Sequence, residues 1–122
     1  MNQPNRLIPN AEHAEVPPEK ITRYLLDLGS DDGHAKAVFF IGRGFSPALW
    51  PTLAEALRRQ VGTVPFVQES NSQWGTKYVV EGPLHCPDGS VVNVRSVWNI
   101  KPPSPNPRLI TAYPTPHPRR IR

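Results

Sequence analysis

Cysteine is nearly absent from this sequence of 122 residues, which contains only Cys86. A single cysteine cannot form an internal disulfide, and this is typical of a protein kept in a reducing compartment. Long apolar runs are missing too, since no segment approaches the roughly 20 apolar residues of a membrane-spanning helix. The first ten residues also lack the basic and apolar stretches of a secretory signal. We therefore expect a soluble, cytoplasmic protein.

Motifs for metal and cofactor binding are missing as well. The four histidines are scattered, and neither a CxxC pair nor an HExxH motif occurs. Gly42-Arg43-Gly44 lacks the third glycine and the preceding strand of a phosphate-binding loop. Cys86 has only His85 beside it, which does not make an activated nucleophile. The sequence therefore predicts no bound metal and no cofactor.

Acidic residues become scarce in the second part of the chain. Residues 1–69 contain seven Lys and Arg against eight Asp and Glu, whereas residues 70–122 contain seven against two. This distribution favours a polyanionic or acidic partner, either RNA or an acidic neutralising protein. The alternative is a proline-rich basic tail that only aids solubility, because three of these charges are Arg119, Arg120 and Arg122.

The length fits one domain, which we place at residues 1–114, followed by a basic proline-rich tail at 115–122. Apolar residues at helical spacing predict three helices, over residues 17–28, 34–41 and 46–60. Ser46 followed by Pro47 is a typical start for the third helix. The side chains expected on the buried sides are Ile21, Tyr24, Leu25, Leu28, Ala37, Val38, Phe40, Ile41, Leu49, Trp50, Leu53, Ala56 and Leu57.

After residue 61 the apolar spacing becomes alternating, which is typical of strands. We expect strands at 64–69, 75–81 with an extension to 85, 90–101 and 108–114. Short turns join them, so helices are followed by a meander. This order predicts an α+β fold in which N-terminal helices pack on one face of a four-stranded antiparallel sheet. Trp98 is expected in the core.

The last strand, Arg108–Pro114, carries a basic residue, a hydroxyl and an aromatic ring. Strict alternation places Leu109, Thr111 and Tyr113 on one face and Arg108, Ile110 and Ala112 on the other. Arg108 and Thr111 can therefore serve one site only at a twisted strand end or beside a bulge.

Several of these polar residues suit the cleavage of RNA by its own 2′-hydroxyl, which needs an acid, a base and cations but no metal. His34 can transfer protons, and Lys36 can hold a phosphate. Arg108 and Thr111 offer a cation and a hydroxyl on the last strand. The residues expected to contact RNA are Lys77, Arg95, Ser96 and Tyr113. For each of these side chains, packing or solvation is the alternative role.

Residue runs along most of the chain also point to a family. These runs are Leu7–Glu12, Val16-Pro17, Lys20–Leu26, Gly33–Ala37, Phe39-Phe40, Gly44-Phe45, Gly75–Gly82, Val97-Trp98 and Arg108–Pro114. Together they resemble an uncharacterised family of short bacterial proteins, which occur beside small antitoxin-like partners and as C-terminal modules of large secreted toxins. The last run is similar to the final strand of ribonuclease toxins of the barnase, EndoU, colicin and RelE superfamily.

This resemblance implies a toxin of a bacterial toxin–antitoxin system. Its implied activity is metal-independent endoribonuclease cleavage of RNA, with tRNA as one candidate, blocked by a small antitoxin protein. His34 and Lys36 match a His/Lys element near the helix, while Arg108 and Thr111 match the basic residue and hydroxyl of the final strand. Two alternatives stay open: a non-catalytic protein–protein interaction module, and an RNA binder without catalysis.

Overall fold

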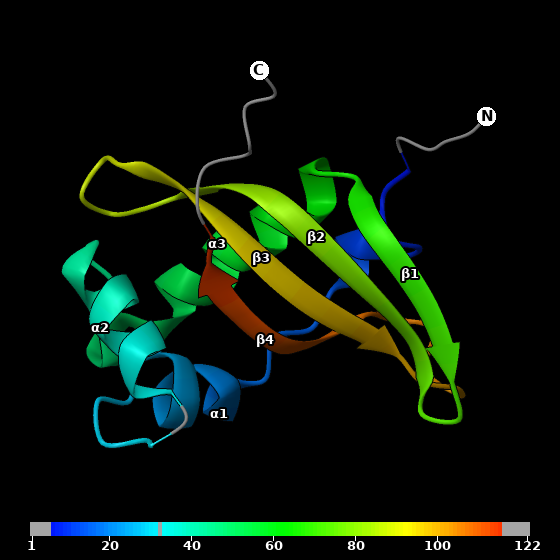
Figure 1. Ribbon diagram of the computed structural model, residues 1–122, viewed down its shortest axis with the longest axis horizontal. Helices are drawn as coiled ribbons and strands as arrows, with labels where there is room; N and C mark the ends of the chain where they lie inside the picture. The colour runs from blue at the N-terminus through cyan, green and yellow to red at the C-terminus, as the bar shows by residue number, and fades with distance from the viewer. Residues whose placement is uncertain (1–5, 32, 116–122) are drawn as a thin grey trace.

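The computed structural model describes residues 6–31 and 33–115. All four strands belong to one antiparallel sheet with the order β1-β2-β3-β4. Their bounds are Phe66–Ser72 for β1, Gly75–His85 for β2, Val91–Ile100 for β3 and Arg108–Pro114 for β4. The helical segments precede the sheet in the chain, which confirms the predicted α+β fold (Figure 1). Beyond Thr115, the predicted tail lies outside the described residues.

The helical segments differ greatly in length. They are η1 Ala11–His13, α1 Pro18–Lys20, η2 Ile21–Leu25, α2 His34–Gly42, η3 Pro47–Leu49 and α3 Trp50–Thr63. In Figure 1, α3 lies behind the sheet, and α1 and α2 lie beside the β4 edge. Ser46 Oγ accepts a hydrogen bond from the Leu49 amide at 3.2 Å, which confirms the predicted cap. In the described part of the chain, no helix has both the length and the apolar character needed to span a membrane.

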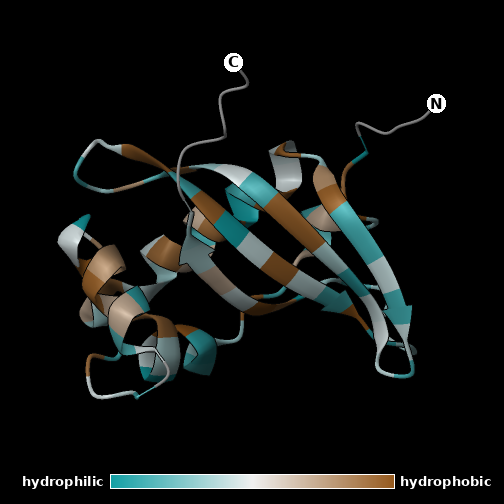
Figure 2. Ribbon diagram, viewed as in Figure 1, coloured by the Kyte–Doolittle hydropathy of each residue, from teal (hydrophilic) through white to brown (hydrophobic). Residues whose placement is uncertain are grey.

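One face of the sheet is covered by α3 and builds the core. Val80, Val94 and Trp98 from the strands are fully buried, as are Leu53 and Leu57 from α3. This covered face carries every second residue of β3, as the alternating hydropathy in Figure 2 illustrates. The burial of Trp98 confirms the prediction.

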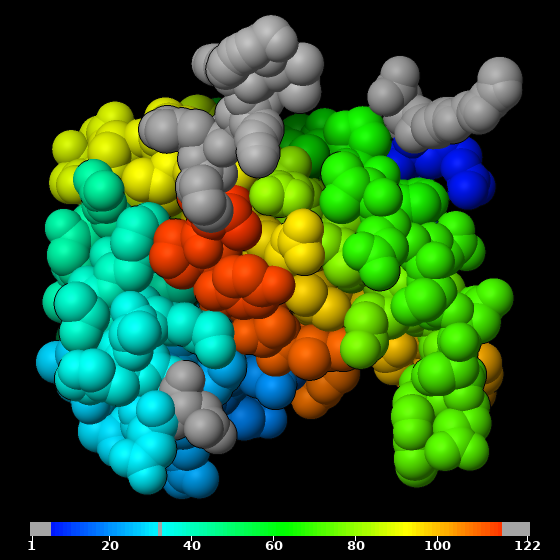
Figure 3. Space-filling model, in the orientation of Figure 1, coloured from blue at the N-terminus to red at the C-terminus, as the bar shows by residue number. Residues whose placement is uncertain are grey.

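The opposite face of the sheet, which we call the open face, carries several charged and polar side chains beside Val79 and Val97. Strand pairing places Glu81, Arg95 and Tyr113 side by side on it, with Lys77 and Thr111 on the same side of their strands. Figure 3 shows this face, with β4 between the helical segments and the strands β1 and β2. The open face is therefore the part of the sheet on which polar side chains can meet a ligand.

Three apolar residues expected in the core are exposed. Leu28 is 51% exposed because the first helix, predicted to reach this residue, ends in a π-helical turn at Leu25. Leu49 is 66% exposed because it lies in the short η3 turn before α3 begins. Val38 is 51% exposed because α2 packs only its other side against η2 and β4. In each case the prediction placed an apolar residue on the buried side of a helix at a position that no other element covers.

Candidate active site

A row of three side chains crosses the open face. Arg95 on β3 pairs with Glu81 on β2 and with Tyr113 on β4. Its Nη2 donates to Glu81 Oε1 at 3.1 Å. The hydrogen bond to Glu81, and then one to Tyr113, raises the pKa of Arg95 above its ordinary value. Among the described residues, Arg95 Nε is a buried nitrogen without a hydrogen-bond partner. This guanidinium is therefore held in place but not fully satisfied.

A second group lies where the helices meet β4. Lys36 Nζ donates to the Tyr24 hydroxyl at 2.5 Å, and this hydroxyl lies 3.5 Å from Thr111 Oγ1. The Lys36 ammonium is also 4.8 Å from the centroid of the Tyr24 ring and 6.0 Å from that of Tyr113. Tyr113 thus connects this group to the row through Arg95. An ammonium, a guanidinium, three hydroxyls and a carboxylate form one continuous site.

Gly33 determines how closely α2 approaches Tyr24. A Cβ at position 33 would lie 2.3 Å from the Tyr24 carbonyl oxygen, so a side chain there would push the two segments apart. Ser30 Oγ fixes the same turn by accepting a hydrogen bond from the Gly33 amide at 3.0 Å. Because α2 begins against Tyr24, Lys36 in its first turn lies beside the Tyr24 hydroxyl.

A bulge in β4 decides which faces its side chains occupy. Thr111 pairs with Val97, but Leu109 pairs with the adjacent Trp98, so Ile110 is the extra residue. Leu109 therefore lies on the covered face with Trp98. Arg108 pairs with Asn99 and lies on the open face with Thr111. The separation of Arg108 and Thr111 expected from strict alternation is wrong for this reason, and the two residues share a face.

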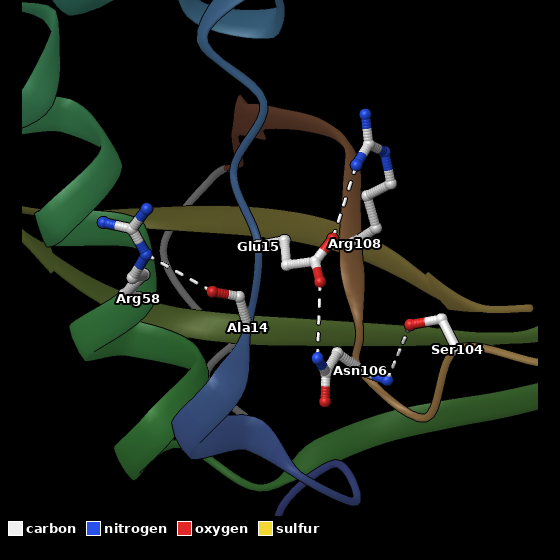
Figure 4. Close-up of polar contacts among 6 residues, drawn as sticks. All are labelled: Ala14, Glu15, Arg58, Ser104, Asn106 and Arg108. Carbon is white, nitrogen blue, oxygen red and sulfur yellow. Dashed lines mark hydrogen bonds and ion pairs between the residues drawn. The ribbon is translucent and has the colours of Figure 1, made fainter.

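Arg108 lines a pocket of about 370 Å³ at the start of β4. The lining residues are Glu15, Lys20, Asn99, Lys101, Ser104, Asn106, Arg108, Leu109 and Ile110. Figure 4 shows how Glu15 organises one wall: its carboxylate accepts from Arg108 Nη1 at 3.3 Å and from Asn106 Nδ2 at 3.3 Å. The Glu15 backbone also pairs with Arg108 in a parallel bridge. The N-terminal segment therefore fixes the Arg108 side chain at the pocket.

The structure separates the remaining predicted residues from one another. His34 is exposed at the start of α2, with Nδ1 2.7 Å from the Leu28 carbonyl oxygen. Lys77 is exposed on the open face of β2. Ser96 is fully buried on the covered face, where its hydroxyl donates to Gln60 Oε1 at 2.7 Å and accepts from Trp98 Nε1 at 2.8 Å. The Ser96 hydroxyl is therefore enclosed by core residues.

Sequence reasoning did not select two residues of this site, Tyr24 and Glu81. Tyr24 matched the apolar stripe of the first helix, which describes its ring but not its hydroxyl. Glu81 is one of only two acidic residues among residues 70–122. The pairing of β2 with β3 places it opposite Arg95, so a prediction of the strand register would have identified it. The described residues contain no group of three or more His, Cys, Asp or Glu arranged to hold a metal ion.

The chain and its fold have relatives among known proteins. The chain belongs to the family described as "Domain of unknown function (DUF6883)", whose family model matches residues 7–116. A search of curated proteins found no match. One chain of the structure titled "Contact-dependent growth inhibition toxin - immunity protein complex from Klebsiella pneumoniae 342" has a TM-score of 0.70 and 16% sequence identity. The alignment covers 88% of the present chain and 97% of that chain, and at this identity it shows a shared fold.

Proposed function

We propose that this protein is a growth-inhibiting toxin that cleaves RNA without a metal ion and is neutralised by a protein partner. Similarity in fold to a chain of a toxin–immunity protein complex supports the toxin part. The observation that carries the proposal is the contact of the Tyr24 hydroxyl with Lys36 and Thr111, adjoining Arg95 and Tyr113 on the open face. Together with the Glu81 carboxylate beside Arg95, they supply the acid, the base and the cations that in-line cleavage of RNA needs.

Tyr24 is our choice for the acid. In this reaction the 2′-oxygen attacks the adjacent phosphorus, its proton passes to a base, and the 5′-oxygen leaves with a proton from an acid. Because Lys36 donates to the phenolic oxygen of Tyr24, the phenolic proton points elsewhere, toward Thr111 or a substrate oxygen. The Lys36 ammonium stabilises the negative charge that remains on Tyr24. We prefer Tyr24 to His34, whose ring nitrogen contacts the Leu28 carbonyl.

The row across the sheet supplies the remaining groups. The Glu81 carboxylate accepts the 2′-hydroxyl proton, and Arg95 stabilises charge on the phosphorus as five oxygens surround it. The Tyr113 ring stacks on a base, and Lys77 attracts the RNA backbone. The products are a 2′,3′-cyclic phosphate and a 5′-hydroxyl.

Cleavage of labelled RNA by the purified protein, with EDTA present, tests the proposal. We expect products that end in 2′,3′-cyclic phosphate. Tyr24→Phe and Lys36→Met are each expected to lower kcat/KM by about 10²–10⁴-fold. Arg59→Ala removes an exposed cation on α3 and should leave the rate unchanged. Circular dichroism verifies that each variant is folded. Uncleaved RNA with the wild-type protein would refute the nuclease proposal.

The second candidate is a binding module without catalysis. The structure with a similar fold is titled as a complex of a toxin with its immunity protein, so a chain of this fold is bound to another protein there. Expression in bacteria separates the candidates: a nuclease arrests growth and degrades RNA, and co-expression of its neutralising protein restores growth. A binding module without catalysis leaves RNA intact in cells that express the wild type or Tyr24→Phe.

A further inference from the structure

The pocket beside Arg108 is lined by more positive than negative charge. Among the described residues that line it, three are positively charged, namely Lys20, Lys101 and Arg108, and one is negatively charged, namely Glu15. The Glu15 carboxylate already accepts hydrogen bonds from Arg108 and Asn106. The ammonium groups of Lys20 and Lys101 therefore keep charges that the pocket wall does not offset. Such a pocket favours an anionic group such as a phosphate.

An exposed aromatic ring adjoins this pocket. Trp74, in the turn between β1 and β2, is 63% exposed, and its ring centroid lies 5.7 Å from Lys101 Nζ. The Trp74 carbonyl accepts from Asn99 Nδ2 at 2.8 Å. At Gly75 a Cβ would lie 2.3 Å from the Ile100 carbonyl oxygen, so the turn packs directly on the end of β3. The backbone of Trp74 is thus fixed, and its indole is presented to solvent beside the pocket lysine.

The pocket adjoins the proposed active site. Lys20 Nζ, which lines the pocket, lies 5.8 Å from the centroid of the Tyr24 ring, and Tyr24 contacts Lys36. Arg108 and Thr111 lie on the same face of β4, about 10 Å apart along the strand. A single RNA strand of a few nucleotides can therefore reach from one position to the other.

We propose that the pocket and Trp74 form a second nucleotide subsite for single-stranded RNA. Lys20 and Lys101 bind one phosphate, and the indole of Trp74 stacks on the adjoining base. Stacking on an exposed ring requires an unpaired base, so a duplex is excluded as the ligand of this subsite. The proposal rests on the proposed function for the reaction at Tyr24, but it concerns binding and is tested separately.

The test measures binding of 2′-O-methyl RNA, which lacks the attacking hydroxyl and is not cleaved. Fluorescence anisotropy compares a labelled hexanucleotide with a dinucleotide. We expect the wild type to bind the hexanucleotide at least about tenfold more tightly. Trp74→Leu should remove about tenfold of this affinity. Lys101→Ala should weaken binding and lower the slope of log affinity against log salt by about 1.

Two variants on other surfaces serve as matched controls. Leu49→Ala removes an exposed apolar side chain, and Arg59→Ala removes an exposed cation. Both should bind the hexanucleotide as the wild type does.

Glu15→Gln should bind it more tightly, by about threefold, because a carboxylate leaves the phosphate pocket. A gain in affinity also separates the subsite from a general loss of folding.

The outcomes distinguish this proposal from the proposed function. Hexanucleotide binding that depends on Trp74 and Lys101, without cleavage of ordinary RNA, supports the subsite and refutes the nuclease. Cleavage with no effect of Trp74→Leu or Lys101→Ala on binding refutes the subsite alone. Binding of polyglutamate as tight as that of RNA, and equal in Trp74→Leu, shows a surface for acidic proteins and also overturns the subsite.

Discussion

The two faces of the sheet use neighbouring residues of the same strands for different purposes. On the covered face, Ser96 and Trp98 are fully buried and their polar atoms are satisfied through Gln60. On the open face, Arg95 directly precedes Ser96 in the chain, yet it is about a third exposed and its Nε lacks a hydrogen-bond partner. Burial with full hydrogen bonding stabilises the fold on the covered face, whereas the partly exposed guanidinium of Arg95 and carboxylate of Glu81 on the open face remain within reach of a ligand.

The covered face should respond most strongly to truncation of Trp98. Trp98→Ala leaves a cavity in the core, and we expect it to lower the free energy of unfolding by about 3–5 kcal/mol. Val91→Ala, at an exposed position of the same strand, should change it by less than about 0.5 kcal/mol. Urea denaturation measures both. Equal effects at the two positions would break the comparison.

Removal of the Gln60 amide tests the polar part of the covered face. Gln60 Nε2 donates to the carbonyl oxygens of Gly82 at 3.0 Å and Val94 at 2.9 Å. Gln60→Ala removes both hydrogen bonds and the acceptor of the buried Ser96 hydroxyl, and the expected loss of unfolding free energy, measured by urea denaturation, is about 1–3 kcal/mol.

Ser96→Ala examines the same cluster from the strand. It should lower the free energy of unfolding by about 1 kcal/mol and leave RNA binding and cleavage unchanged. Thermal unfolding and the cleavage assay are measured on the same preparation. A selective loss of RNA binding at full stability would show that Ser96 reaches the ligand despite its burial.

Alkaline pH should weaken the covered face through Tyr78. Burial, and then the Glu69 carboxylate, raise the pKa of Tyr78 above its ordinary value of about 10. Because the folded state favours the neutral phenol, Tyr78 stabilises the fold fully at pH values below its ordinary pKa. This stabilisation is lost as the pH rises through the raised pKa. The free energy of unfolding should fall above about pH 10. Tyr78→Phe should reduce this fall, and an unchanged pH dependence in the variant would exclude Tyr78 as its source.

The open face should show the smallest change in stability and a large change in activity. Arg95→Met removes a partly exposed ion pair with Glu81, which contributes about 0–1 kcal/mol to folding. In the cleavage assay the same variant should lose at least about tenfold in kcat/KM, because charge stabilisation at the phosphorus is lost. Arg58→Met, which removes the ion pair with Glu55 and a hydrogen bond to the Ala14 carbonyl, is the matched control. Loss of folding in Arg95→Met would mean that the open face also supports the core.

The sequence predicted much of the fold because its signals are local. The alternation of β3, the cap at Ser46 and the prolines around β4 each act within a few residues, and all three elements occur where expected. The ends of helices were less predictable, as Leu28 and Leu49 show, because their exposure depends on what packs nearby. Lys36 and Thr111 were selected by residue type. Tyr24, which connects them, was not, since its role depends on a contact across 87 positions of the chain.

The α+β class, the four strands and the alternation that separates core side chains from polar ones can be predicted from the sequence, because they follow from local backbone preference and the period of the strand. Which polar residues meet depends on the packing of the folded chain. The extra residue Ile110 moves Arg108 to the face of Thr111, and the absence of a side chain at Gly33 lets α2 bring Lys36 to Tyr24. Both depend on how one segment packs against the next, which local backbone preference does not specify.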